Sequence, residues 1–175
     1  GNQRVLVFDL SNGIHNGMPA VGVIGQKDFE SKERLSHNEL RPVVPPSGIT
    51  YDPKFHRLFC GDFDQHRIMV FNAHPDALGE VCNSAELLTV MGQPDKETME
   101  PVIAKNRMAF AKIGPNSIDS ERQMIYVSEG FPGGNRIMIF DIHPDRLADG
   151  MDAIVAMGPF TTHSLRGNAE FRAPN

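Results

Sequence analysis

The stretch that decides the fold is residues 57–72, which read Arg-Leu-Phe-Cys-Gly-Asp, then Phe-Asp-Gln-His, then Arg-Ile-Met-Val-Phe-Asn. Two short runs of strand-compatible residues flank a brief, mostly polar linker. Runs of this length on either side of a short linker predict two antiparallel strands joined by a tight turn.

This stretch has counterparts elsewhere in the chain. Residues 3–9 (Gln-Arg-Val-Leu-Val-Phe-Asp) and 135–141 (Asn-Arg-Ile-Met-Ile-Phe-Asp) resemble residues 66–72. A second apolar run, ending in glycine, follows each of the three at Gly25, Gly92 and Gly158, which gives spacings of 67 (92 − 25) and 66 (158 − 92). Self-similarity at a fixed period indicates a repeat architecture.

A third motif occurs twice. Asp52 precedes Asp62 by 10 positions (62 − 52), and Asp119 precedes Glu129 by the same interval (129 − 119). A polar tetrapeptide follows the first acid of each pair, so the spacing predicts a hairpin with a fixed loop. Each full repeat therefore supplies four strands, near residues 48–52, 57–62, 67–72 and 86–92.

Poor polar–apolar alternation in these runs predicts sheets covered on both faces. Four-stranded antiparallel sheets that cover one another at a fixed period are blades of a β-propeller, so we expect an all-β fold of that kind. Leucine-rich and ankyrin solenoids would show leucine or helix patterns that this sequence lacks. The side chains expected in the core are Phe59, Val70, Phe71, Tyr126, Ile139 and Phe140.

The repeat boundaries predict a half blade in residues 1–30, full blades in 40–95 and 108–160, and the start of a further repeat in 161–175. Such an incomplete ring of about two and a half blades leaves the edge at Val5–Phe8 bare. Bare strand edges recruit other strands. We therefore expect either a homodimer or a section of a longer propeller.

The quoted residues resemble the NHL repeat, especially its long bacterial form. The resemblance rests on residues 46–52 (Pro-Ser-Gly-Ile-Thr-Tyr-Asp), 57–62 and 66–71, and it covers nearly the whole chain. The chain departs from the family pattern at three places. His66 replaces the usual Asn, Glu129 replaces the strand-end Asp, and Asn116-Ser117 replaces the glycine in the first strand of the second full repeat. The resemblance implies a propeller that acts mostly as a binding scaffold; a few members are lyases with a metal in the central channel. A fold alone does not imply an activity.

Composition narrows the partners. The net charge of −5 argues against binding to nucleic acid, because such binding takes most of its free energy from Lys and Arg side chains that contact phosphates. No apolar stretch approaches the length of a membrane-spanning helix, so we expect no membrane partner. Cys60 and Cys82 match no zinc-ligand spacing and need not form a disulfide. Their number does not identify the cellular compartment.

The candidate ligand-binding residues lie in the loops between the second and third strands: Asp62, Asp64, His66, Glu129 and Asn135. Their oxygens could hold a polar ligand or a cation such as calcium. The structural alternative is that each acid accepts turn amides and pairs with the arginine that follows it.

His74-Pro75-Asp76 and His143-Pro144-Asp145 are equivalent tripeptides that could supply metal ligands, although proline and an early acid fit better at the start of a short helix. The sequence has no nucleophile elbow and no other catalytic motif. We therefore predict no catalytic residue, no metal and no cofactor. The expected function is a scaffold that binds a protein or small molecule; the alternative is a propeller-type lyase or hydrolase with a metal or an acid/His set at the channel.

Overall fold

The computed structural model describes residues 4–26, 28–31, 46–63, 65–74, 85–98, 113–130 and 135–158. Within these ranges the chain forms strands and no helix, which confirms the all-β class. The strands are β1 (Val5–Val7), β2 (Gly22–Ile24), β3 (Pro46–Asp52), β4 (Arg57–Asp62), β5 (Arg67–Asn72), β6 (Leu87–Met91), β7 (Ile113–Asp119), β8 (Met124–Glu129), β9 (Arg136–Asp141) and β10 (Val155–Met157).

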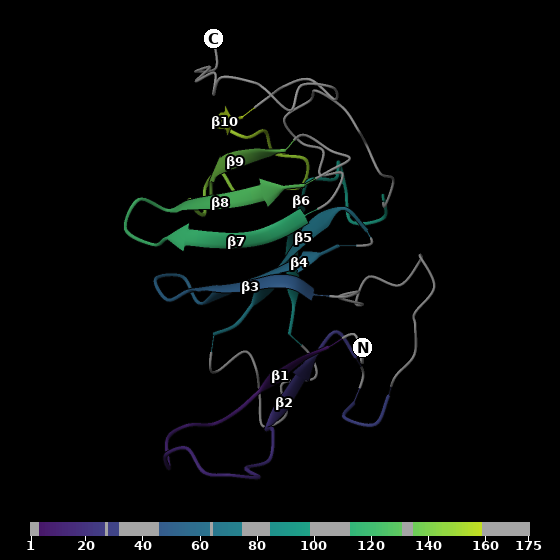
Figure 1. Cartoon of the computed structure of the whole chain (residues 1–175), viewed down its shortest axis with the longest axis vertical. Helices are drawn as coiled ribbons and strands as arrows, with labels where there is room; N and C mark the ends of the chain where they lie inside the picture. The colour runs from purple at the N-terminus through teal and green to yellow at the C-terminus, as the bar shows by residue number, and fades with distance from the viewer. Residues whose placement is uncertain are drawn as a thin grey trace.

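These strands form three antiparallel sheets (Figure 1). The first sheet has the order β3-β4-β5-β6, the second has β7-β8-β9-β10, and β1 pairs with β2 alone. Both four-stranded sheets are simple meanders, as the repeat predicts. The predicted bounds of β4 and β5 agree with the structure, whereas β3 begins earlier, at Pro46, because a bulge extends its pairing with β4.

The hairpin loops of the two large sheets have the same geometry. In each, the strand-end aspartate accepts a hydrogen bond from the backbone two residues on: Lys54 N donates to Asp52 Oδ1 at 3.1 Å, and Glu121 N donates to Asp119 Oδ1 at 3.1 Å. The last loop residue adopts a positive φ in both, 50° at His56 and 53° at Gln123. The predicted fixed loop is confirmed.

The recurrent glycines also share one conformation. Gly25, Gly92 and Gly158 follow β2, β6 and β10 with φ values of 94°, 90° and 125°. Side chains other than glycine rarely adopt this region. The spacing found in the sequence therefore corresponds to one turn used three times.

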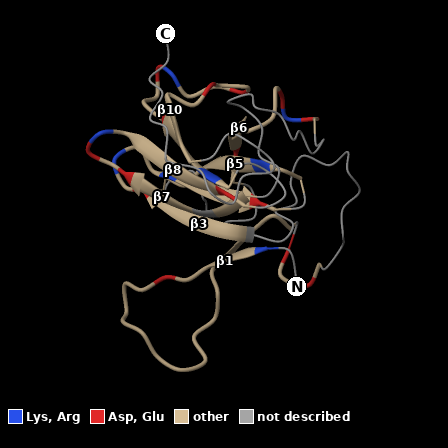
Figure 2. Cartoon of the chain, turned by 45° about the horizontal axis from the view of Figure 1, so that its top comes forward, with Lys and Arg blue, Asp and Glu red and all other residues tan. Residues whose placement is uncertain are grey.

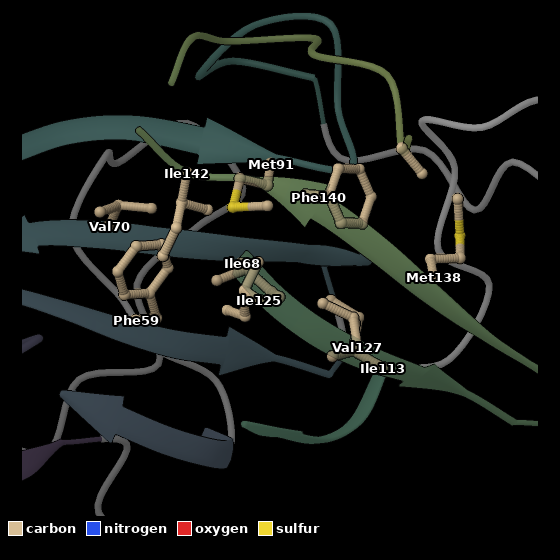
Figure 3. Packing of buried hydrophobic residues seen from close by; sticks show 11 residues of the cluster. Phe59, Ile68, Val70, Met91, Ile113, Ile125, Val127, Met138, Phe140 and Ile142 are labelled. Carbon is tan, nitrogen blue, oxygen red and sulfur yellow. The ribbon is translucent and has the colours of Figure 1, made fainter. Parts of the chain in front are cut away.

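The sheets stack in chain order. β3 lies beside β7, and one core joins the two large sheets (Figures 1 and 3). Phe59, Ile68 and Val70 of the first sheet pack there with Met138 and Phe140 of the second. The opposite face of the first sheet packs on the β1–β2 pair, in a cluster that contains Cys60, Met69, Phe71, Val90 and Ile24.

Each sheet therefore presents the same positions to the sheet before it. Met69 and Phe71 face β1–β2, and their repeat equivalents Met138 and Phe140 face the first sheet. We call this side of a sheet its preceding face and the other its following face. Of the six expected core residues, five are buried, whereas Tyr126 is only half-buried because it lies on the following face of the second sheet.

A small-residue exchange distinguishes the two large sheets. In the first, Ser47 of β3 lies over Gly61 of β4; in the second, Gly114 of β7 lies over Ser128 of β8. These are equivalent positions with serine and glycine exchanged. A Cβ at either glycine would fall well inside contact distance of the opposing serine Oγ, so each pair has room for one side chain.

The helix expected after His143 is absent. Arg146 N and Leu147 N both donate to His143 O, at 2.8 and 3.0 Å, and the chain makes a single turn before leaving it. Pro75, Asp76 and residues 161–175 lie outside the described residues. No helix in the described ranges is long and apolar enough to span a membrane.

Candidate functional site

The two predicted strand-end acids are buried in ion pairs. Asp62 lies directly across from Arg67, with Oδ2 3.5 Å from the arginine Nε, and both side chains are fully buried. Glu129 lies across from Arg136 and accepts a hydrogen bond from its Nε. This is the structural alternative expected from the sequence, in which each acid pairs with the next arginine.

Arg67 is held on several sides. Its Nη1 donates to the carbonyl of Lys96 at 2.7 Å, and its Nη2 donates to Gln65 Oε1. Burial lowers the pKa of Arg67, and the Asp62 charge partly offsets that shift. The guanidinium therefore fixes the turn between β4 and β5 and ties it to the segment after β6.

The residues before these arginines share a left-handed backbone, with φ 56° at His66 and 45° at Asn135. The His66 carbonyl accepts a hydrogen bond from Gln93 Nε2 at 3.2 Å. His66 is half-buried and Asn135 is exposed. Asp64 lies outside the described residues, so Asn135 is the most accessible of the predicted ligand residues that the structure describes.

The opposite end of the sheets carries four exposed or half-buried rings. We define the hairpin-end surface as Lys54, Phe55, His56, His74 and His143. The Phe55 and His143 rings lie 6.2 Å apart, centre to centre, with planes at 73°, and they come from different sheets. The His56 and His74 rings lie 4.7 Å apart at 81°. This surface combines the apolar ring of Phe55 with imidazole nitrogens and the exposed ammonium of Lys54.

A buried network supports the hairpin-end surface. Arg57 Nη2 donates to Asp52 Oδ2 and to Gln123 Oε1, both at 2.6 Å. Gln123 Nε2 donates in turn to Asp52 Oδ1 at 3.3 Å. The Arg57 guanidinium carbon also lies 5.1 Å from the centre of the Phe55 ring. The loop of the first sheet is thereby bonded to the loop of the second.

Sequence reasoning missed this surface. His74 and His143 are equivalent in the repeat, but the ring that contacts His143 is Phe55, from a loop one repeat earlier. Arg57 also has no counterpart to signal its role, because Met124 occupies the equivalent position. The signal that would identify this surface is the repeat itself, because equivalent sheets stacked face to face bring their hairpin loops to one end.

Charge at this end is mixed. Figure 2 shows acidic and basic residues next to each other at the β7–β8 hairpin, where Arg122 Nη1 lies 2.7 Å from Asp119 Oδ2. In the part of the chain that the structure describes, no three His, Cys, Asp or Glu side chains are grouped to hold a metal ion.

No protein-family model matches the sequence, and no curated protein matches it either.

Proposed function

We propose that the chain is a section of a β-propeller built from NHL-type repeats and that it serves as a binding scaffold. The observation that carries the proposal is the stacking of its sheets, each with the same face toward the one before it. Stacking of this kind gathers loops of one type at one end. Repeat proteins use such gathered loops as extended binding surfaces.

The hairpin-end surface is the better of two candidate contacts. Lys54, Phe55 and His74 are exposed and His56 and His143 are half-buried, while the bonds among Arg57, Asp52 and Gln123 hold the loops in place. Aromatic rings on a rigid support give large contact areas with little loss of conformational entropy. The other candidate is the opposite end, with Asp62, Asp64, His66, Glu129 and Asn135.

The test is a selection of random displayed peptides against the intact chain, with the best peptide then titrated against variants. Phe55 and Leu88 are matched, since each is 37% exposed, but only Phe55 belongs to the hairpin-end surface. We expect Phe55→Ser to weaken binding by roughly tenfold or more, as loss of an aromatic anchor does. Leu88→Ser should leave binding unchanged.

Two outcomes would count against this assignment. Peptides that lose affinity on Asn135→Ala but not on Phe55→Ser would move the contact to the opposite end. If no saturable peptide binder emerges, the scaffold proposal itself fails.

The alternative is a propeller-type lyase or hydrolase. Elemental analysis of protein purified without chelator tests it directly. One equivalent of zinc or calcium per chain would favour the enzyme, because a resident metal supplies the Lewis acid that such chemistry uses.

A further inference from the structure

The loop between β1 and β2 carries two asparagine–glycine pairs, Asn12-Gly13 and Asn16-Gly17, and the sequence has no others. The loop extends away from the sheets (Figures 1 and 2), and all four residues are exposed. A Cβ placed on either glycine would meet nothing within 4 Å. The two pairs are therefore equally open to solvent, and hydrogen bonding is what distinguishes them.

An asparagine that precedes glycine can lose its side-chain amide without an enzyme. The deprotonated backbone nitrogen of the glycine attacks Cγ of the asparagine, the bond from Cγ to Nδ2 breaks, and ammonia leaves. Water then opens the five-membered succinimide ring, so the residue ends as aspartate or isoaspartate. Glycine favours the attack because it has no Cβ to obstruct it. A hydrogen bond from the glycine nitrogen opposes the attack, since that bond has to open first.

Asn12-Gly13 lies in a hydrogen-bonded segment. Gly13 N donates to the Leu10 carbonyl at 3.0 Å, which closes a turn around Asn12. Just before it, Ser11 N donates to Asp9 Oδ1 at 2.9 Å, and the hydrogen bonds from Ser11 lower the pKa of Asp9. The nitrogen that would attack Asn12 is thus engaged, and the residues before it are held in place.

Asn16-Gly17 lacks this restraint. Within the described ranges Gly17 N donates no hydrogen bond, and the turn around it is closed by the bond from Met18 N to the His15 carbonyl, at 3.4 Å. That distance is longer than in a typical N–H···O hydrogen bond, so this turn opens at little cost. The His15 ring nitrogen Nδ1 lies 3.4 Å from the Asn16 carbonyl oxygen, a contact that leaves the glycine nitrogen unengaged.

We propose that Asn16 is a site of spontaneous deamidation, and that Asn12 in the same loop is protected by the hydrogen bond from Gly13 N. Each event replaces a neutral amide by a carboxylate and adds one negative charge to the loop. Residues 5–26 contain no Lys or Arg, so no basic side chain in that segment offsets the new charge. The inference goes beyond the proposed binding function and does not depend on it.

The aspartate product fits the turn in which it forms. Asn16-Gly17-Met18 corresponds in the repeat to Asp149-Gly150-Met151, and φ is 75° at Gly17 and 68° at Gly150. Asp149 Oδ1 accepts a hydrogen bond from Val90 N, on the neighbouring sheet, at 2.8 Å. Deamidation therefore converts Asn16 into the acid that the equivalent turn already carries.

The test follows both sites in one sample. The intact chain is incubated in mildly alkaline buffer, and peptide mapping by mass spectrometry measures the loss of each amide. We expect Asn16 to react roughly fivefold faster than Asn12 or more, which is the factor that an ordinary hydrogen bond corresponds to. In guanidinium chloride that unfolds the chain, the difference should largely disappear, because neither glycine nitrogen is then held in a native turn.

Asn16→Gln is the matched control, because glutamine would have to close a larger ring. It should remove the faster site and leave the rate at Asn12 unchanged. Hydrogen exchange gives an independent readout, since the amide of Gly17 should exchange faster than the bonded amide of Gly13.

Three results would overturn the inference: equal rates at Asn12 and Asn16 in the folded chain, no reaction at either, or the same ratio of rates in guanidinium chloride. The last would show that the native hydrogen bonds are not the cause. Asn16 is not part of the hairpin-end surface, so peptides that bind through Phe55 test the proposed function separately.

Discussion

The two four-stranded sheets are built from equivalent residues but have different surroundings. The first, β3–β6, is packed on both faces, against β1–β2 and against β7–β10. The second has a packed preceding face, while its following face is partly open among the described residues. Ile68 is fully buried on the first sheet, and its equivalent Ile137 is 42% exposed on the second.

The repeat therefore specifies a sheet with two apolar faces whether or not both are covered. Tyr126, Ile137 and Met157 keep the apolar character of Phe59, Ile68 and Met91. Burial is thus a property of position in the stack. We therefore expect equivalent residues to contribute equally to stability where their surroundings match, and unequally where they differ.

The largest loss of stability should come from removing the buried arginine that each of the two large sheets has at the equivalent position. Arg67→Ala and Arg136→Ala should each lower the free energy of unfolding by about 3–5 kcal/mol, because each leaves a buried carboxylate without its partner. Urea denaturation of the purified variants measures this. Arg122→Ala, in an exposed pair, should unfold as the original protein does. A large loss at Arg67 with none at Arg136 would show that the two turns are not energetically equivalent.

The equivalent residues Ile68 and Ile137 should differ in how much they stabilise the fold. Ile68→Ala should cost about 2–5 kcal/mol of unfolding free energy, because it opens a cavity in the shared core. Ile137→Ala should cost less than about 1 kcal/mol, as expected of a half-exposed side chain. Equal losses would mean that the following face of the second sheet is covered in solution, as in a dimer. Light scattering on the same samples would identify that case.

Substitution of the glycines after β6 and β10 should lower the free energy of unfolding by smaller amounts, which should differ between the two sheets. Gly92→Ala should cost about 1–2 kcal/mol, since alanine disfavours a φ of 90°. Gly158→Ala should cost more, because its Cβ would lie 2.8 Å from the carbonyl oxygen of Asn135. Gly130→Ala is the control, as its Cβ meets nothing within 4 Å. Thermal melts would reveal the order, and a neutral Gly92→Ala would contradict the strained turn.

The smallest expected signal is at Cys60, a buried free thiol on the preceding face of the first sheet. Burial, with a smaller contribution from the Asp62 charge, raises its pKa to about 12. In a Cys82→Ser background it should stay unmodified by a thiol reagent at pH 8, whereas a Cys60→Ala, Ile137→Cys variant should react at once. Rapid reaction of Cys60 would show that β1–β2 does not keep the face covered.

The same shift has a consequence for stability. Because the folded thiol holds its proton to higher pH than the unfolded thiol, whose pKa is near 9, stability should fall from about pH 9 upward. Cys60→Ala should remove that part of the pH dependence.

Much of the fold could be predicted because strand positions follow local patterns. The bounds of β4, β5 and β8 agree with the repeat alignment, since each begins directly after a turn and ends at a polar residue. β1, β2 and β10 are shorter than their motifs. The short turn at His143 differs from the predicted helix because only two bonds form at its start, to Arg146 and Leu147.

The candidate site was harder to predict. The sequence leaves two roles open for Asp62 and Glu129, ligand binding or pairing with the arginine that follows, and the structure shows the pairing. The ring contact of Phe55 with His143 depends on the distance between two sheets, which no local pattern contains. Long-range packing, more than chain-local chemistry, determines which side chains reach the surface.

The exchanged serine and glycine bear on how an array of this kind could evolve. Repeat arrays change length when equivalent stretches of two repeats recombine. A crossover between positions 47 and 61 would join Ser47 to the serine of the other repeat, or Gly114 to the other glycine. The first product would crowd two hydroxymethyl groups into room for one, and the second would leave a gap. Recombination outside that interval keeps each pair intact, so whole hairpins are the units that can be shuffled at least cost.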